Sequence, residues 1–454
     1  MAGLLQLAAW GWIRHLGDLS QHVEQLWWCL LPILVGYGLG AWALRLGQIP
    51  RAAWIIGGVA IVARLLLLDS TPSLSDDIYR YLWDGRVQEA GLNPYGQAPA
   101  AEGLSPMHDD DWAKINHPEL VTVYPPVAQW FFHLVRRLAP GVTGMKTALV
   151  LCDLLLILVL WDWLGARGQD RRRVLVYAWH PLPVLEIAGN GHVDVLGILC
   201  LCIALLWLHG GRRHAAALAL TAAVLSKMIP LLCMGAFWRQ LATTGSASTS
   251  KWKRCWSSLN PRPRLTLLWV PVLVFFAYLP FVQAGATMWT GLSAYASKWR
   301  FNDSAYGLIY KLLSDPKPGW QWDDEALLAA RWVGLGMVAL IIAWSAVRSR
   351  DPAAACAAVF GAQLLLAPTV HPWYVLWVLP FLVLRSCPAW MTFSWSVLLA
   401  YDVLGAYRSS GLWQESTSIR LLEYGPVYLL LLLPLWRRLH GGSRNGARVP
   451  TSTT

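Results

Sequence analysis

The sequence predicts an all-α protein, a polytopic bundle of about 11–13 membrane-spanning helices with short amphipathic helices in its first outer loop. Charged residues make up only 14% of the 454 residues, whereas a soluble domain carries roughly 25%. Apolar stretches of about 17–25 residues recur along the chain, and each is long enough to cross a bilayer. The 29 Trp suit membrane interfaces, because indole joins an apolar body to a hydrogen-bond donor.

The apolar stretches define three parts of the chain. Residues 1–25 lack the basic start and cleavage site of a signal peptide, and Trp10 and Trp12 predict an interfacial segment there. Residues 26–438 form the predicted membrane domain, and the polar residues 439–454 a disordered cytoplasmic tail. The predicted spans are 26–46, 52–68, 143–164, 174–188, 193–208, 215–227, 229–238, 265–282, 327–346, 353–369, 373–384, 391–404 and 421–436.

Basic residues set the orientation, because they gather in short loops such as 167–173 and 239–264 that should face the cytoplasm. The net charge of +11 is therefore a topology signal and does not predict nucleic-acid binding. An outer loop then covers residues 69–142, and its part 69–122 holds ten of the 26 acids and three bases. A second outer loop covers 283–325. No eukaryotic retrieval signal is evident, which favours a prokaryotic plasma membrane.

Two adjacent carboxylates, Asp76 and Asp77, begin the first outer loop. Charge at the membrane edge is costly and tends to be functional, although Asp is also favoured at helix N-termini. The following residues predict an amphipathic helix on the membrane surface. Its faces would carry Asp76, Arg80 and Trp83 on one side and Asp77, Tyr81 and Asp84 on the other. Residues 127–138 predict either a second surface helix or a true span.

Further polar groups fall at the predicted outer ends of spans, in residues 190–194, 226–228, 298–300 and 371–374. Acids, cations and aromatic rings around one cavity suit a sugar-phosphate site. Each group also has a structural interpretation. Lys227 and Arg64 would snorkel to the interface, Asp153 and the pair His192 and Asp194 would join neighbouring helices, and His371 would cap a broken helix.

Six short motifs occur in order along the first half of the chain, namely 76–80, 91–95, 124–126, 152–155, 189–194 and 227–230. Together they resemble integral-membrane type C glycosyltransferases. The resemblance is to mannosyltransferases that use polyprenyl- or dolichyl-phosphate-mannose, including the catalytic subunit that adds the first mannose of the GPI anchor. That enzyme has Asp-x-Asp-Tyr where this chain has Asp-Asp-x-Tyr, so the choice between Asp76 and Asp77 stays open.

The resemblance implies transfer of a hexose, mannose by analogy, from a polyprenyl-phosphate donor to an extracytoplasmic lipid or glycan acceptor. Single displacement would use Asp76 or Asp77 as general base. The predicted ligands of the donor phosphate are Arg80, Lys227, Lys298, Arg300 and His371. The predicted sugar and acceptor contacts are Tyr81, Tyr124, Asn190, His192 and Trp373. No cofactor is predicted, and a divalent metal is compatible with this chemistry but not required.

Three rival functions share some of these signals. A transporter or lipid flippase would also show broken helices and intramembrane charge, but would not need a long acidic-aromatic outer loop. An oligosaccharide polymerase or ligase also uses lipid-linked sugars, with its informative loop late in the chain. A non-catalytic envelope subunit would not depend on either Asp.

Overall fold

The computed structural model describes residues 1–47, 49–243, 262–314 and 323–441. Helices dominate this part of the chain, and the one bridge of β type within it joins Phe301 to Thr369. The prediction of an all-α bundle is confirmed. The predicted tail, 439–454, and the basic loop 239–264 fall largely outside the described residues.

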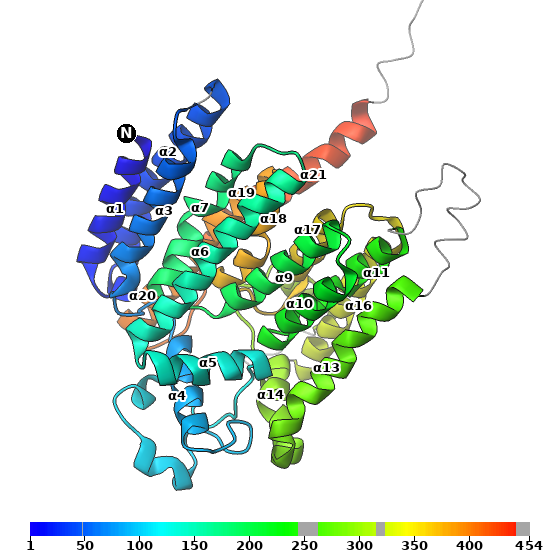
Figure 1. Ribbon diagram of the computed structural model, residues 1–454. Helices are drawn as coiled ribbons and strands as arrows, with labels where there is room; N and C mark the ends of the chain where they lie inside the picture. The colour runs from blue at the N-terminus through cyan, green and yellow to red at the C-terminus, as the bar shows by residue number, and fades with distance from the viewer. Residues whose placement is uncertain (48, 244–261, 315–322, 442–454) are drawn as a thin grey trace, which may run out of the picture.

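Three helices begin the chain and lie side by side, namely α1 (Ala2–Leu16), α2 (Val23–Leu46) and α3 (Ala52–Leu68) (Figure 1). α1 packs along both of its neighbours, and Trp10 is fully buried against them. Trp12, two residues further, is exposed. The N-terminal segment is therefore joined to the bundle along one face, while its interfacial position stays a prediction.

Two short helices, α4 (Asp77–Glu89) and α5 (Pro126–Leu138), pack against each other at one end of the bundle (Figure 1). Pro126 starts α5, where its missing N–H costs no hydrogen bond. α5 buries Ala128, Phe132 and Val135 at helical spacing on one face. With 13 residues it is shorter than the roughly 20 that a span needs, which favours the surface-helix interpretation.

The centre of the bundle consists of α6 (Val142–Ala166), α9 (Asp194–His209), α10 (Arg213–Ser226) and α17 (Pro352–Leu366). Between α6 and α9 the helix is interrupted, so the predicted span 174–188 is not one continuous helix. This segment contains the short helices α7 (Leu175–Ala178) and α8 (Pro181–Pro183) and then a π-helix, Val184–Gly189. Pro181 and Pro183 cannot donate backbone N–H groups, which prevents a regular helix through this segment.

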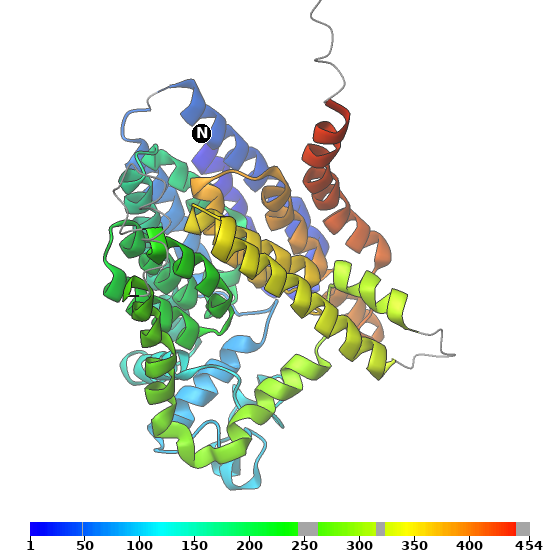
Figure 2. The ribbon, with the colours of Figure 1, turned by 90° about the vertical axis from the view of Figure 1, so that its right-hand side faces the viewer.

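The second half of the chain contains both long and short helices. They are α11 (Met234–Thr243), α13 (Trp269–Tyr278), α14 (Thr290–Lys298), α15 (Ala305–Leu313), α16 (Asp324–Arg348), α18 (Leu379–Leu384), α19 (Pro388–Ser396), α20 (Asp402–Ser410) and α21 (Thr417–Gly441). The predicted spans 229–238, 373–384 and 391–404 each contain a 3₁₀ segment. α14 reaches the end of the molecule where α4 lies (Figure 2).

Four helical stretches of the described residues are long and apolar enough to cross a membrane. They are Val23–Leu46, Val142–Ala166, Pro263–Lys298 and Asp324–Arg348. Shorter apolar helices are Ala52–Leu68, Asp194–His209, Arg213–Ser226 and Pro352–Leu366. These stretches confirm a membrane bundle, and the total of about 11–13 crossings stays a prediction.

The ion pair between Arg64 and Asp153 is fully buried inside the bundle. Arg64 of α3 donates through Nε to Asp153 of α6, and neither side chain is exposed. Arg64 Nη1 also donates to the carbonyl of Ala178 at 2.9 Å, and Tyr177 Oη donates to Asp153 at 2.7 Å. The prediction that Arg64 snorkels to the interface is wrong, because a buried carboxylate neutralises it in place. Asp153 has the helix-joining contacts that its position in a span favoured.

Candidate active site

The two carboxylates at the start of α4 have different surroundings. Asp76 is the residue before the helix, but its side chain makes no capping hydrogen bond. Asp77 is the first helical residue, and its Oδ2 lies 3.6 Å from Nδ1 of His192. Asp76 is exposed, whereas Asp77 points toward the turn that contains His192. Capping therefore does not explain the pair of acids.

The electrostatic environment separates the two acids further. Burial opposes ionisation of Asp77, but His192, Lys227 and His371 outweigh it and hold the pKa of Asp77 below its ordinary value. Partial loss of water around the carboxyl group and the charge of Asp77 raise the pKa of Asp76, against a smaller opposing effect of Arg408. The surroundings therefore move the pKa values of the two acids in opposite directions.

His192 lies between two carboxyl groups. Its Nε2 is 3.4 Å from Oε2 of Glu186, and both side chains are fully buried. Glu186 accepts hydrogen bonds from Tyr401 Oη at 2.7 Å and from Asn190 Nδ2 at 3.2 Å. Glu186 belongs to the π-helix, a feature that is frequent at functional sites. The sequence analysis missed Glu186, although an acid inside an apolar segment is a signal in itself.

A stack of three rings joins the two halves of the chain at this point. Trp373 lies parallel to His192 at 3.9 Å between ring centroids and to His371 at 4.3 Å. Trp373 belongs to the 3₁₀ segment Pro372–Trp377. The stack fixes the ring plane of His192, whose two nitrogens lie near the two carboxyl groups without making a hydrogen bond to either.

Lys227 and Asp194 form the charged pair of the site. Lys227 Nζ donates to both carboxylate oxygens of Asp194 at 2.7 Å, and Trp377 Nε1 donates to the same carboxylate at 2.6 Å. Nζ also lies 4.9 Å from the ring centroid of Tyr374, whose hydroxyl bonds to that of Tyr295. Asp194 is 1% exposed but Lys227 is 24% exposed, so the cation can still be reached from outside.

A glycine lets the turn with His192 approach α4. Gly191 has a φ of 78°, in the region that side chains rarely adopt. A Cβ at this position would lie 2.5 Å from Cδ1 of Ile78, on the first turn of α4. Asn190, a predicted sugar contact, accepts from the backbone N–H of Leu74 at 3.3 Å. Asn190 thus ties the loop before α4 to Glu186.

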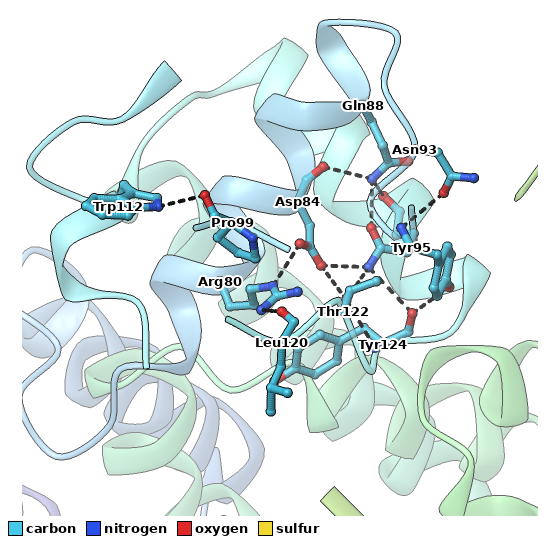
Figure 3. A network of polar contacts seen from close by, with 11 residues as sticks. Arg80, Asp84, Gln88, Asn93, Tyr95, Pro99, Trp112, Leu120, Thr122 and Tyr124 are labelled. Carbon is cyan, nitrogen blue, oxygen red and sulfur yellow. Dashed lines mark hydrogen bonds and ion pairs between the residues drawn. The ribbon is translucent and has the colours of Figure 1, made fainter. Parts of the chain in front are cut away.

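Arg80 lies in a different network, within residues 69–142 (Figure 3). Its Nε donates to Asp84 at 2.9 Å, one helical turn away, and its Nη1 donates to the carbonyl of Leu120 at 2.9 Å. Asp84 also accepts from Thr122, as Figure 3 shows, and from Gln129. The expected opposite faces for Arg80 and Asp84 are wrong, because residues four apart on a helix are neighbours.

Two other predicted phosphate ligands also lie apart from Asp77. Arg300 pairs with Asp303 and lies 4.6 Å from the ring centroid of Tyr310. Lys298 is exposed at the end of α14. Of the five predicted cations, the structure brings only Lys227 and His371 close to Asp77.

The predicted sugar contacts Tyr81, on α4, and Tyr124, just before α5, pack against each other. Their rings meet edge to face at 5.0 Å, and Tyr81 stacks on Phe132 at 4.7 Å. The hydroxyl of Tyr81 is buried beside Tyr124 and the backbone of Val193.

Within the described ranges, no three His, Cys, Asp or Glu side chains are grouped in a way that could hold a metal ion. His192, Glu186 and Asp77 form a row with the imidazole in the middle, whereas a metal needs its ligands to converge on one point. The expectation of no cofactor, with a divalent metal compatible but not required, stays a prediction.

The helical membrane bundle agrees with the architecture of an integral-membrane glycosyltransferase of type C, and the comparison of families supports that class. Comparison with protein-family models matches residues 7–243 to the family described as alpha-(1->6)-mannopyranosyltransferase, N-terminal domain. The match covers more than half of the chain, which therefore belongs to this family of mannosyltransferases. Comparison with curated proteins found no match. Asp77, Glu186, His192 and Lys227 lie inside the matched range, whereas the stacking residues from Trp373 onward lie beyond it.

Proposed function

We propose that this mannosyltransferase moves mannose from a polyprenyl-phosphate donor to a lipid or glycan acceptor and forms an α-(1→6) linkage. The sugar and the linkage come from the description of the family. The reaction takes place on the extracytoplasmic side of a prokaryotic plasma membrane, where the acidic outer loop is predicted to lie. Nucleotide sugars are cytosolic, which makes a lipid-linked donor the natural one at this site.

Asp77 is the general base of the proposed reaction, and its position beside His192 is the observation that carries the proposal. The carboxylate takes the proton of the acceptor hydroxyl as the oxygen attacks the anomeric carbon of mannose. The bond from that carbon to the phosphate oxygen breaks, and polyprenyl phosphate leaves with the electron pair. A general base contributes about 10²–10⁴-fold in rate. Asp76 is the weaker candidate, because its side chain is exposed and makes no capping hydrogen bond, whereas Asp77 lies beside His192.

His192 and Glu186 position the base. The imidazole favours the ionised form of Asp77, and Glu186 faces the other ring nitrogen at 3.4 Å. This arrangement resembles the way a carboxylate orients a catalytic imidazole in other enzymes. Asp77 has the role of the group that touches the acceptor, and Glu186 acts through His192.

Lys227 receives the leaving phosphate. An ammonium carries three N–H donors, and Asp194 occupies two of them. The third donor and the exposed part of Lys227 remain for a phosphate oxygen. A fixed cation beside a developing charge acts strongly at a water-poor site. His371, held by Trp373, is the second candidate ligand.

The proposed mechanism also fixes the stereochemistry of the donor. Single displacement inverts the anomeric carbon, so an α-linked product requires a β-linked mannosyl phosphate. A synthetic α-linked mannosyl lipid should therefore be inert. Turnover of the α-linked lipid to an α-linked product would contradict single displacement.

The test is transfer from radiolabelled polyprenyl-phosphate-mannose by the purified protein in detergent, with GDP-mannose as a control donor. Wild type, Asp76→Asn and Asp77→Asn are compared, each checked for an unchanged unfolding temperature. We expect transfer from the lipid donor alone, a loss of about 10²–10⁴-fold in Asp77→Asn and a much smaller loss in Asp76→Asn. Equal and mild losses in both variants would remove Asp77 as the base. Binding of the lipid without any turnover would favour a flippase.

A further inference from the structure

A hollow lies at the far end of the bundle from Asp77. Its volume is about 300 Å³, at the lower end of what small-molecule pockets occupy. It lies where α6, α9 and α11 end and α17 begins, and these ends share one side of the molecule in Figure 1. α9 runs from Asp194 at the active site to His209 at the hollow, which places the two sites about 20–25 Å apart at 1.5 Å per residue.

The polar lining of this hollow consists mainly of hydrogen-bond donors. Arg167, His209, Gln240 and Arg350 contribute guanidinium, imidazole and amide groups, and Trp163 and Leu205 add apolar surface. The lining contains one carboxylate, Asp351.

Asp351 is already occupied by contacts of its own. It accepts two hydrogen bonds from Arg167, at 3.0 and 2.9 Å. It also caps the start of α17 by accepting from the backbone N–H of Ala353 at 3.1 Å. One guanidinium is therefore neutralised by Asp351, and the charge of Arg350 is left for an incoming group. An anion with several acceptor oxygens matches this lining.

The place of the hollow indicates where the anion comes from. It lies between helices at the end that the basic loops predict to face the cytoplasm. Basic pockets between membrane helices on that side bind anionic lipid head groups, and the inner leaflet attracts cationic side chains. We propose that this hollow binds the phosphate of an anionic phospholipid head group, in a site separate from that of the donor lipid.

Three substitutions test the proposal with effects of different sign. Arg350→Gln removes the available charge and should weaken binding about fivefold or more. Asp351→Asn keeps a residue that caps helices well, but removes the competing charge and frees Arg167, so binding should tighten. Arg348→Gln is the matched control, since Arg348 is an exposed arginine two residues away that does not line the hollow.

Binding is measured by native mass spectrometry of the purified protein, titrated with phosphatidylglycerol, with phosphatidylcholine or with inorganic phosphate. We expect one tight phosphatidylglycerol per chain, weaker phosphatidylcholine, and affinities in the order Asp351→Asn, wild type equal to Arg348→Gln, then Arg350→Gln. Equal weakening by Arg348→Gln and Arg350→Gln would overturn the site in favour of a diffuse basic surface. Dependence on Arg350 for inorganic phosphate but not for the lipid would overturn the lipid as its ligand.

Discussion

The bundle contains two ion pairs between a cation and a carboxylate that differ in their exposure to solvent. Arg64 and Asp153 join α3 to α6, and neither side chain is exposed. Lys227 and Asp194 join the end of α10 to the start of α9, and Lys227 is 24% exposed. Pairing and burial are therefore not enough to distinguish a structural cation from one that meets a ligand. Arg64 also keeps an unpaired nitrogen, Nη2, so the difference lies in exposure: only Lys227 has a side that a ligand can reach.

The largest expected effect comes from breaking the fully buried pair of Arg64 and Asp153. Arg64→Met leaves Asp153 buried without its cation and should lower the free energy of unfolding by about 3–5 kcal/mol. Replacing both residues, as Arg64→Met with Asp153→Leu, should recover most of that loss, because two apolar side chains need no partner. Thermal unfolding in detergent measures both effects. A double variant as unstable as the single one would contradict a purely structural role.

For the partly exposed pair, Lys227 and Asp194, substitution should lower the rate of transfer, and removing the partner should not restore it. Lys227→Met should lower the rate of mannosyl transfer by about 10²–10³-fold, the scale seen when one electrostatic stabiliser of a transition state is removed. Adding Asp194→Asn should restore stability but not the rate, because no cation is left for the phosphate. Transfer rates and unfolding temperatures are measured on the same preparations. Recovery of the rate in the double variant would make this pair structural, like the first.

The turn that carries His192 lies close to α4, and position 191 permits this approach. Gly191→Ala should cost about 1–3 kcal/mol, since a Cβ would meet Ile78 and the backbone there has positive φ. Ile78→Val removes the atom that clashes and should return part of the stability in the double variant. Gly168→Ala, at a positive-φ glycine with open space around it, gives the cost of the backbone alone. Equal losses at both glycines would show that α4 does not constrain this turn.

The smallest expected effect is a shift in the pH dependence of transfer. His192 helps to hold the pKa of Asp77 below its ordinary value, so His192→Gln raises that pKa. Asp77 works as a base only when ionised, and the acid limb of kcat/KM should therefore move to higher pH. His108→Gln, in the outer loop where the ring stacks on Trp112, is the control and should leave the limb in place. A limb that stays or moves to lower pH in His192→Gln would exclude this coupling.

The sequence alone could predict the helical membrane bundle, because a bundle depends on local patterns of charge and hydropathy, and it singled out Asp77 and Lys227, which the structure brings near each other. The pair of Arg80 and Asp84 was also within its reach, since residues four apart on a helix are neighbours. The carbonyl of Leu120 was not, because it lies 40 residues away in the chain. Glu186 was missed because its role comes from the π-helix and from Tyr401, more than 200 residues away in the chain.

The ring stack on Trp373 has a consequence for the order of events during synthesis. His192 and Glu186 are synthesised early, whereas Trp373, whose ring stacks on His192, is synthesised about 180 residues later. At roughly 5–20 residues per second, that delay is about 9–36 s. During this interval the ribosome still holds the chain, and Asp77 faces an imidazole without its stacking partner. The proposed site is therefore complete only late in translation, after the segment around residue 377 has been synthesised.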